Sequence, residues 1–274
     1  MGQASTIAPR RDGEPKVSVL ARTVIELKGV SKVFKTRQGE VRALEGIDLA
    51  IRNNEFVCLL GPSGCGKSTI LGSIAGLTKP SSGAILIDGK SIEAARQGHK
   101  IGLVFQEAVL LPWRTAYENV SLPLEVLKVP RNERAARIKS VLDLVGLSGF
   151  EQRYPHELSG GMRQRLGIAR ALSFDPQVLL MDEPFGALDA ITRDSMSIEL
   201  LRIWGQQQKT VVFVTHSISE AALLSDRVVV FTPRPGRIAA IVDNPLPRPR
   251  PLHLRDSTEF LALSRQLRNL LGAE

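Results

Sequence analysis

The sequence has little cysteine, few aromatic residues and no long apolar run, and each shortage excludes a class of protein. Its two cysteines, Cys58 and Cys65, stand without clustered histidines, so neither a disulfide framework nor a zinc site is expected, and a reducing compartment fits. Aromatic residues make up only 5% of the chain, which leaves few stacking platforms, and we expect no nucleic-acid partner. The apolar runs, such as residues 228–231, have the length of a strand, whereas a membrane-spanning helix needs about 20 apolar residues.

The first residues also lack an apolar segment of the signal-peptide type. Charged residues occupy the region where such a segment would lie, namely Arg10, Arg11, Asp12, Glu14 and Lys16. We therefore expect the chain to remain in the cytoplasm unless a partner carries it to a membrane. The net charge of +8 would suit an anionic membrane surface, a nucleic acid or a nucleotide, but the basic residues are scattered and solvated surface explains them most simply.

Short runs of β-branched and apolar residues alternate with helical patterns along most of the chain. Strands are expected at residues 24–27, 49–51, 56–60, 84–87, 101–105, 178–181, 210–214 and 227–231. Helices are expected at residues 66–77, 159–173, 189–206, 217–224 and 258–271, with two or three more in residues 117–146, where Pro130 breaks the pattern. This alternation predicts an α/β fold with a mostly parallel core sheet covered on both faces.

The two ends of the chain depart from this alternation. Residues 1–22 are polar and basic and contain two prolines, Pro9 and Pro15, which predicts a loose N-terminal arm. Residues 244–274 begin with a segment rich in proline and arginine, at 245–251, and end with an amphipathic pattern. We expect a spacer followed by a final helix there.

Residues 61–68 match the pattern G-x-x-x-x-G-K-[ST] of a phosphate-binding loop, directly after an apolar strand and before a helix. Backbone N–H groups of such a loop and the positive end of the helix dipole surround phosphate oxygens. Lys67 is expected to reach the β and γ phosphates, and the Ser68 hydroxyl to ligate Mg²⁺. The expected nucleotide-binding residues are Gly61, Pro62, Ser63, Gly64, Cys65, Gly66, Lys67, Ser68 and Thr69. Cys65 is either a reactive thiol beside Lys67 or an inert small side chain.

A second buried strand, residues 178–181, is followed by two carboxylates. Asp182 is placed to hold Mg²⁺, and Glu183, one residue further, to polarise an attacking water as general base. The alternative is that this acidic pair only caps a helix or ends the strand in solvent. A phosphate loop upstream in the same chain favours the catalytic interpretation.

Residues 158–165, Leu-Ser-Gly-Gly-Met-Arg-Gln-Arg, resemble the LSGGQ signature of ATP-binding cassette proteins, with Met162 at the position often held by glutamine. A serine and two glycines that open a helix form a second anion-binding terminus. The resemblance covers residues 24–242, and the absence of an internal repeat indicates one cassette. It implies a P-loop NTPase fold in residues 23–243, with an N-terminal antiparallel β subdomain and a helical signature subdomain at about residues 107–175.

The same resemblance implies roles for residues outside the phosphate loop. Phe34 matches the aromatic residue that stacks on adenine, although a core position is the alternative. Gln106 matches the glutamine that contacts Mg²⁺ or water and senses the membrane partner, Asp189 lies in the loop that communicates across the dimer, and His216 matches the switch histidine on the γ-phosphate. The implied catalytic residues are Glu183, His216 and Gln106, and the implied metal ligands are Ser68, Gln106 and Asp182.

In that family Ser159, Gly160 and Gly161 cap the ATP bound by the opposite subunit, so the implied assembly is a head-to-tail homodimer that uses ATP and Mg²⁺. The implied partners are transmembrane permease subunits and, indirectly, a solute-binding protein. The implied location is peripheral, on the cytoplasmic face of the bacterial inner membrane. Trp113, in the loop after Gln106, is either a contact to the permease or a core residue.

Three local strings narrow the resemblance further. Residues 111–115, 184–189 and 233–238 resemble the ATPase subunits of bacterial nitrate, sulfonate and taurine importers. An exporter ATPase, or an importer of another solute such as a vitamin or pyrimidine precursor, stays an alternative. A chromosome-maintenance ATPase is excluded because only 114 residues (182 − 68) separate Ser68 from Asp182, without a coiled coil. A ribosome-associated factor usually carries two cassettes in one chain, whereas this sequence contains one.

Overall fold

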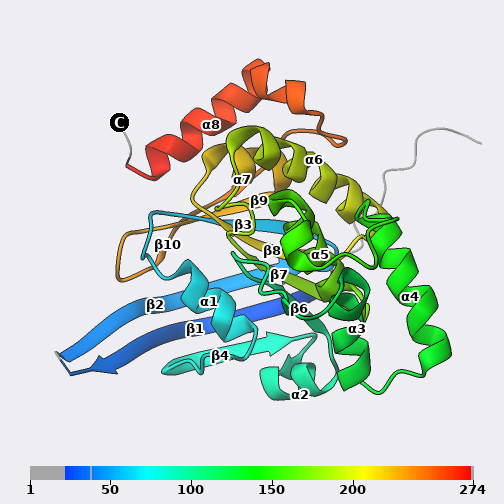
Figure 1. Cartoon of the computed structure of the whole chain (residues 1–274). Coiled ribbons are helices and arrows are strands. Elements are labelled where there is room, and N and C mark those ends of the chain that lie inside the picture. Colours follow the sequence, from blue (N-terminus) through cyan, green and yellow to red (C-terminus); the bar gives the residue numbers. More distant parts are fainter. Residues whose placement is uncertain (1–21, 38, 273–274) are drawn as a thin grey trace, which may run out of the picture.

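A computed structural model describes residues 22–37 and 39–272 of the chain, in which two β-sheets enclose helix α1 (Lys67–Ile74) (Figure 1). The antiparallel sheet has the order β2-β1-β4-β5, and the larger sheet has the order β10-β9-β3-β8-β7-β6, parallel except for β10. The antiparallel strands are β1 (Thr23–Thr36), β2 (Gly39–Arg52), β4 (Ser82–Ile87) and β5 (Lys90–Ser91). The strands of the larger sheet are β3 (Phe56–Leu60), β6 (Ile101–Val104), β7 (Val178–Asp182), β8 (Thr210–Thr215), β9 (Arg227–Phe231) and β10 (Ile238–Asp243).

The helices surround the two sheets, and some of them cover the larger sheet on both faces. They are α1 (Lys67–Ile74), α2 (Ile92–Gln97), α3 (Ala116–Val126), α4 (Arg131–Leu144), α5 (Gly160–Leu172), α6 (Ala190–Gln207), α7 (Ile218–Leu224) and α8 (Thr258–Leu270), with 3₁₀ turns η1 (Pro155–Glu157) and η2 (Leu252–Asp256). Within residues 22–37 and 39–272, every helix is too short or too polar to cross a membrane. The predicted fold class, an α/β P-loop architecture with an antiparallel β part and a helical part, is confirmed.

The central strands are buried on both faces because their side chains alternate between two apolar cores. In β3, Phe56, Cys58 and Leu60 join the core under α5, α6 and α7. Val57 and Leu59, on the opposite face, join the core around α1 and the antiparallel sheet. A strand covered on both sides must be apolar at every position, which is why residues 56–60 form an uninterrupted apolar run.

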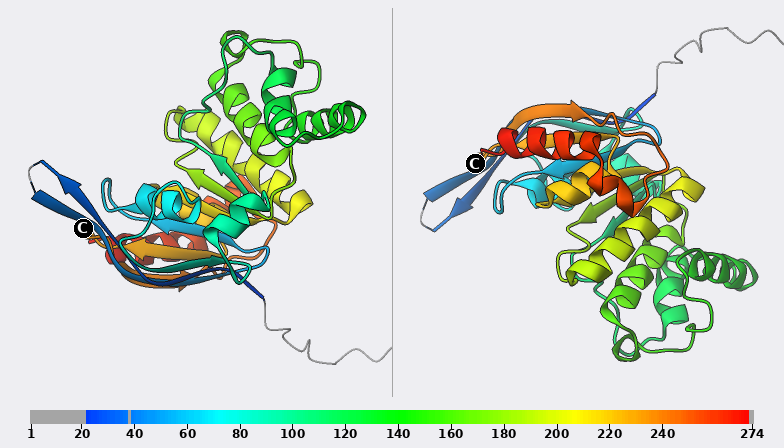
Figure 2. Two further views of the ribbon diagram at one scale, coloured as in Figure 1. Left: turned by 90° about the horizontal axis from the view of Figure 1, so that it is seen from below. Right: turned by 90° about the horizontal axis from the view of Figure 1, so that it is seen from above.

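The helical insertion predicted between residues 117 and 146 consists of α3 and α4, and it stands with α5 to one side of the sheets (Figure 2). A reciprocal capping box starts α3: Thr115 Oγ1 accepts from the Glu118 N–H at 3.2 Å, and Glu118 Oε2 accepts from the Thr115 N–H at 2.8 Å. Pro130 lies immediately before α4, where its fixed backbone angle suits a helix start. The subdomain limits at residues 107–175 remain a prediction.

The hairpin β1–β2 is much longer than the two short strands predicted from the sequence. Its outer half pairs polar residues, as in Lys35 opposite Glu40, and is largely exposed. Backbone pairing rather than burial forms this half, so no apolar alternation marks it. Helix α2 and strands β5 and β10 were also not predicted; α2 and β5 are short, and β10 is a sheet edge with one buried residue, Val242.

The segment at residues 245–251, predicted as a spacer, is attached to the domain by buried arginine contacts. Arg250 is only 5% exposed and donates to the carbonyl oxygens of Leu223 and Ser225 at the end of α7, at 3.1 and 2.6 Å. Arg248 lies over the Trp204 ring, 4.1 Å from its centroid. Burial lowers the pKa of Arg250 to about 10, which leaves the guanidinium charged at neutral pH. From composition alone these arginines would be assigned to the solvent, but their long aliphatic stems also make apolar contacts.

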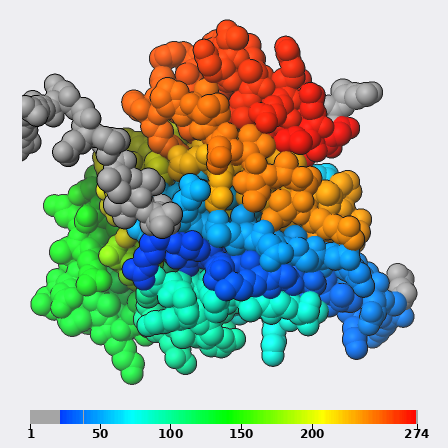
Figure 3. Space-filling view, turned by 180° about the vertical axis from the view of Figure 1, so that it is seen from behind, coloured from blue at the N-terminus to red at the C-terminus, as the bar shows by residue number. Residues whose placement is uncertain are grey.

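Helix α8 packs against α7 through one apolar face, which contains Phe260, Leu263 and Leu267. Figure 3 shows the C-terminal residues, orange to red, closely packed on the body of the molecule. The division between residues 23–243 and 244–274 stays a prediction. The predicted N-terminal arm lies outside the described residues, apart from Arg22.

Candidate functional site

The predicted phosphate loop connects the buried strand β3 to helix α1. Gly66 has a φ of 104°, and a Cβ at this position would lie 2.7 Å from Leu44 Cδ2 and 2.8 Å from the Ala43 carbonyl oxygen. Glycine is therefore required for the loop to turn against β2. No side chain caps the start of α1, so its first N–H groups remain available to an anion.

Lys67 reaches back across the phosphate loop. Its side chain is buried, and Nζ donates to the carbonyl oxygens of Gly61 at 2.8 Å and Pro62 at 2.9 Å. Phosphate oxygens in the loop would compete with these neutral acceptors, because a charge-assisted hydrogen bond is stronger than one to a carbonyl. The neighbouring Cys65 is 1% exposed, which favours the inert small side chain over the reactive thiol.

A cavity of about 230 Å³ opens over the loop. The residues that line it come from four parts of the chain: Phe34, Val41, Ala43, Ser63, Gly64, Gly66, Lys67, Ser68, Thr69, Glu183 and Arg234. Phe34 is 40% exposed at the edge of this cavity, with Lys32 Nζ 4.9 Å above its ring, so the alternative of a core phenylalanine is wrong. Val41, Ala43 and Arg234 were not predicted, because only the folding of β2 and the β9–β10 turn onto the loop brings them there.

Ser68 and Asp182 face each other beside the loop. Ser68 Oγ donates to Asp182 Oδ1 at 2.9 Å, and burial raises the pKa of Asp182 above its usual range. Among the described residues there is no cluster of three or more His, Cys, Asp and Glu that could enclose a metal. One hydroxyl and one carboxylate fit Mg²⁺, which takes few protein ligands and completes its shell with water and phosphate oxygens.

Glu183 and His216 come together where β7 and β8 end. His216 Nδ1 lies 3.0 Å from Glu183 Oε2, and the Glu183 N–H donates to the Val214 carbonyl oxygen at 3.1 Å. The parallel pairing of β7 with β8 places both residues at the same edge of the sheet. Glu183 has a φ of 42°, an uncommon angle for a non-glycine residue that turns its side chain toward the cavity over the loop.

The remaining predicted residues lie elsewhere in the chain. Ser159 caps α5 by accepting from the Met162 N–H at 3.3 Å, and Asp189 caps α6 by accepting from the Thr192 N–H at 3.0 Å. Gln106 and Gly160 line a separate cavity of about 460 Å³. A Cβ on Gly186 would lie 3.1 Å from Gln106 Nε2, so this amide rests against the loop after β7. None of Gln106, Ser159, Gly160, Gly161 and Asp189 is among the residues that line the cavity over the phosphate loop.

A glycine-rich loop between a buried strand and a helix, with two carboxylates at the end of another parallel strand of the same sheet, defines a P-loop nucleoside triphosphatase. The model of the "ABC transporter" family matches residues 44–186, just over half of the chain. The chain therefore belongs to the ABC transporter family, and it is an ATPase.

Individual relatives agree with this assignment. An aliphatic sulfonates import ATP-binding protein of Bacillus cereus is 46% identical over 226 residues, which cover 82% of this chain and 88% of that protein. A taurine import ATP-binding protein of Rhizobium johnstonii is 48% identical over 221 residues, which cover 80% of this chain and 84% of that protein. An ATP-binding cassette solved as a dimer in a post-hydrolysis state with ADP and Pi is 36% identical, with a TM-score of 0.70, over 80% of this chain and 98% of that one.

We expect Lys67→Ala to abolish measurable ATP binding while the fold survives, because the phosphate charge would then face only backbone dipoles. Binding is measured by fluorescence titration or calorimetry, and folding by thermal unfolding. Lys90→Ala, which removes an exposed lysine of β5, is the matched control and should bind ATP normally. ATPase activity close to wild type in Lys67→Ala would show that this loop is not the nucleotide site.

Proposed function

We propose that the chain is the motor of an importer for small sulfonates such as taurine. It acts as a head-to-tail homodimer bound to membrane-spanning permease subunits on the cytoplasmic face of the cell membrane, and a solute-binding protein delivers the solute. The import functions of the Bacillus and Rhizobium relatives support import and this solute class. The observation that carries the motor function is the contact between Glu183 and His216 beside the phosphate loop.

Hydrolysis requires a base, a charge clamp and a fixed γ-phosphate. Glu183 accepts the proton of the attacking water, while His216 holds the Glu183 carboxylate in place and contacts the γ-phosphate. Lys67 turns from the loop carbonyls to the β and γ phosphates, and Phe34 stacks on adenine. Ser68, Asp182 and Gln106 would hold Mg²⁺, which when bound neutralises charge on the phosphates.

Dimerisation explains why the signature residues lie away from the chain's own phosphate loop. Ser159, Gly160 and Gly161 open α5, a helix of 13 residues whose N-terminus favours an anion. A Cβ on Gly161 would lie 3.1 Å from Thr192 Cγ2, so α5 and α6 begin side by side and Asp189 starts the neighbouring helix. In a head-to-tail pair these two helix starts face the γ-phosphate held by the other subunit.

We expect Glu183→Gln to bind ATP, to lose most of its turnover and to elute as an ATP-dependent dimer, because unhydrolysed ATP joins the two chains. Adding Ser159→Arg should abolish this dimer, since a long cation cannot occupy the place where a small hydroxyl meets phosphate. Size-exclusion chromatography with and without ATP measures both effects.

Two controls accompany these dimer variants. Glu259→Gln on α8 should hydrolyse ATP normally, and Ser140→Arg on the exposed side of α4 should leave the dimer intact. Normal hydrolysis by Glu183→Gln would show that another residue is the base. If Glu183→Gln alone elutes as a monomer in the presence of ATP, the dimer needs the permease.

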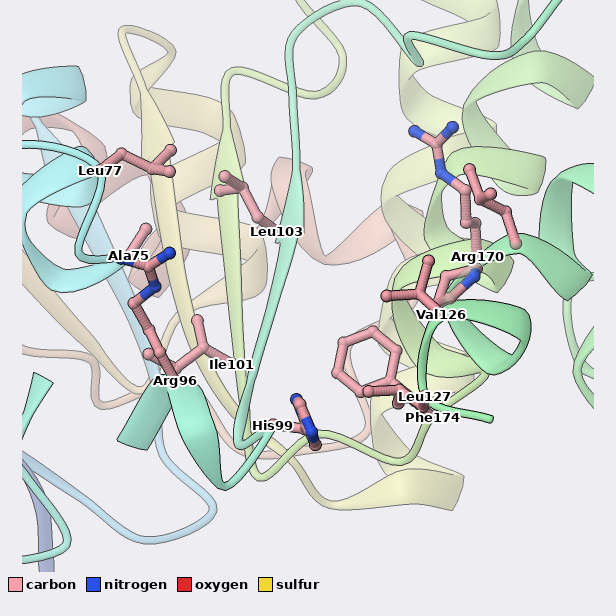
Figure 4. Close-up of a pocket in the computed structure, with 12 residues that line it drawn as sticks. Ala75, Leu77, Arg96, His99, Ile101, Leu103, Val126, Leu127, Arg170 and Phe174 are labelled. Carbon is pink, nitrogen blue, oxygen red and sulfur yellow. The ribbon is translucent and has the colours of Figure 1, made fainter. Parts of the chain in front are cut away.

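The permease would dock in an apolar groove between the layered sheets and the helical part. This groove of about 470 Å³ is lined by Ala75, Leu77, Arg96, His99, Ile101, Leu103, Leu122, Pro123, Val126, Leu127, Arg170 and Phe174. Figure 4 shows two facing walls, one with Leu77 and Leu103, the other with Val126 and Phe174. An exposed apolar groove of this size is typical of a site that a partner covers, here an apolar cytoplasmic segment of the permease.

Arg170 connects the groove to the loop that follows Gln106. Its side chain lines the groove and donates to the carbonyl oxygens of Ala108 and Val109, both at 2.8 Å. A permease segment in the groove therefore acts on the backbone two residues from Gln106. Trp113, in the same loop, is 71% exposed, so the alternative of a core residue is wrong and its side chain is free to contact a partner.

We expect Val126→Asp to reduce co-purification of the chain with its permease, because a carboxylate is costly to bury in a mostly apolar interface. Trp113→Ala should weaken the same association by removing an aromatic contact. Leu261→Asp, at another exposed apolar position, on α8, should not affect it. Unchanged co-purification of Val126→Asp, with normal folding, would place the permease elsewhere.

We expect cells that express the chain with its permease to accumulate labelled taurine, and to lose this uptake when Lys67 is replaced by alanine. Lys90→Ala is again the control. Uptake of a different solute would show that the proposed substrate class is wrong, while the proposed import function would stand. ATP-dependent efflux would instead identify an exporter.

A further inference from the structure

Glu220 is a buried carboxylate that has no role in the hydrolysis proposed above. It lies on α7, is 6% exposed, and stands four positions after His216 in the chain. Burial raises the pKa of Glu220 above its usual range. A buried carboxylate is costly unless neighbouring groups compensate it, so its contacts indicate what it does for the fold or the site.

The first set of contacts fixes the backbone on both sides of His216. The Thr215 hydroxyl donates to Glu220 Oε2, and Thr215 Oγ1 accepts from the Ser217 N–H at 2.9 Å. Ser217 Oγ in turn accepts from the Glu220 N–H at 3.3 Å. Residues 215, 217 and 220 thus form a closed ring of hydrogen bonds that includes both chain neighbours of His216. The half-exposed His216 imidazole itself contacts Glu183.

The second set of contacts leads to the start of α6. Arg193 Nε lies 3.7 Å from Glu220 Oε1, and Arg193 Nη2 donates to the Leu188 carbonyl oxygen at 3.0 Å. Leu188 directly precedes Asp189, the cap of α6. The Glu220 carboxylate therefore connects two segments. Through Arg193 it reaches the backbone at Leu188, and through Thr215 it reaches the backbone beside His216.

We propose that Glu220 is a positioning residue that holds His216 against Glu183 and links this geometry to the Leu188–Asp189 segment. The inference rests on the proposed hydrolytic roles of Glu183 and His216. Glu220 acts through the backbone at residues 215–217 and through Arg193, and it does not contact the nucleotide. A small displacement of a group that orients the base slows the chemical step while nucleotide binding is preserved.

The test is Glu220→Gln in the full-length chain, because glutamine keeps the size and an acceptor for the Thr215 hydroxyl but cannot form the ion pair with Arg193. We expect kcat for ATP hydrolysis to fall by about tenfold to a hundredfold, with KM for ATP changed by less than about twofold. Glu199→Gln is the matched control: Glu199 lies on α6 and forms a surface ion pair with Arg202 at 2.6 Å. It should leave both constants unchanged.

Arg193→Met tests the link to the Leu188–Asp189 segment. It should lower kcat in the same way, and the double variant Glu220→Gln/Arg193→Met should be no slower than the slower single variant, because both remove one connection. An unchanged kcat in Arg193→Met, or fully additive losses, would overturn the link. A lower thermal stability of Glu220→Gln with an unchanged kcat for the folded fraction would make Glu220 purely structural and overturn the inference.

Glu183→Gln and His216→Ala, measured in parallel, separate this inference from the proposed function. If both lose turnover while Glu220→Gln retains it, the positioning role is wrong and the hydrolytic roles stand. If Glu183→Gln and His216→Ala retain turnover, the hydrolytic roles are wrong, and the positioning role falls with them.

Discussion

The carboxyl ends of β3, β7 and β8 meet at one edge of the larger sheet, and the rest of the site depends on this constraint. Leu60 at the end of β3 pairs with Thr215, and Val214 pairs with Asp182 at the end of β7. The phosphate loop, the acidic pair and His216 follow these strands, so they emerge at the same level although they lie far apart in the sequence. Parallel strands allow this arrangement because all of their carboxyl ends point the same way.

The phosphate loop is also confined from its outer side. The turn between β9 and β10 packs on it so tightly that a Cβ on Gly236 would lie 2.0 Å from the Cys65 carbonyl oxygen. The same turn is bonded to β2, where the Gly236 N–H donates to the Ala43 carbonyl oxygen at 3.0 Å. The antiparallel sheet, the loop and the larger sheet therefore form one rigid support. A loop held in this way meets a phosphate with its N–H groups already oriented.

The parts of the chain that face partners are connected to this support by single polar side chains. Gln164 on α5 donates its amide N–H groups to the carbonyl oxygens of Gln106 and Pro184, which joins the helical part to the loop after Glu183. Arg170 on the same helix holds the backbone after Gln106 beside the groove. A rigid-body movement of α5 would thus shift the Gln106 loop and the segment after β7 together. This arrangement suits a motor in which docking and hydrolysis influence each other.

The sequence by itself determined the alternation of strands and helices except for α2, β5 and β10, and β9 matches the prediction residue for residue. It also determined the phosphate-loop motif, because contiguous residues carry these signals. Only the tertiary structure decided that Arg234 and Val41 line the cavity, that Arg250 is buried, and that Glu220 pairs with Arg193. These contacts join elements that lie far apart in the sequence, and such contacts leave no repeating pattern of residues that could predict them. Their energies depend on desolvation and on neighbours that exist only after the sheets and helices have packed.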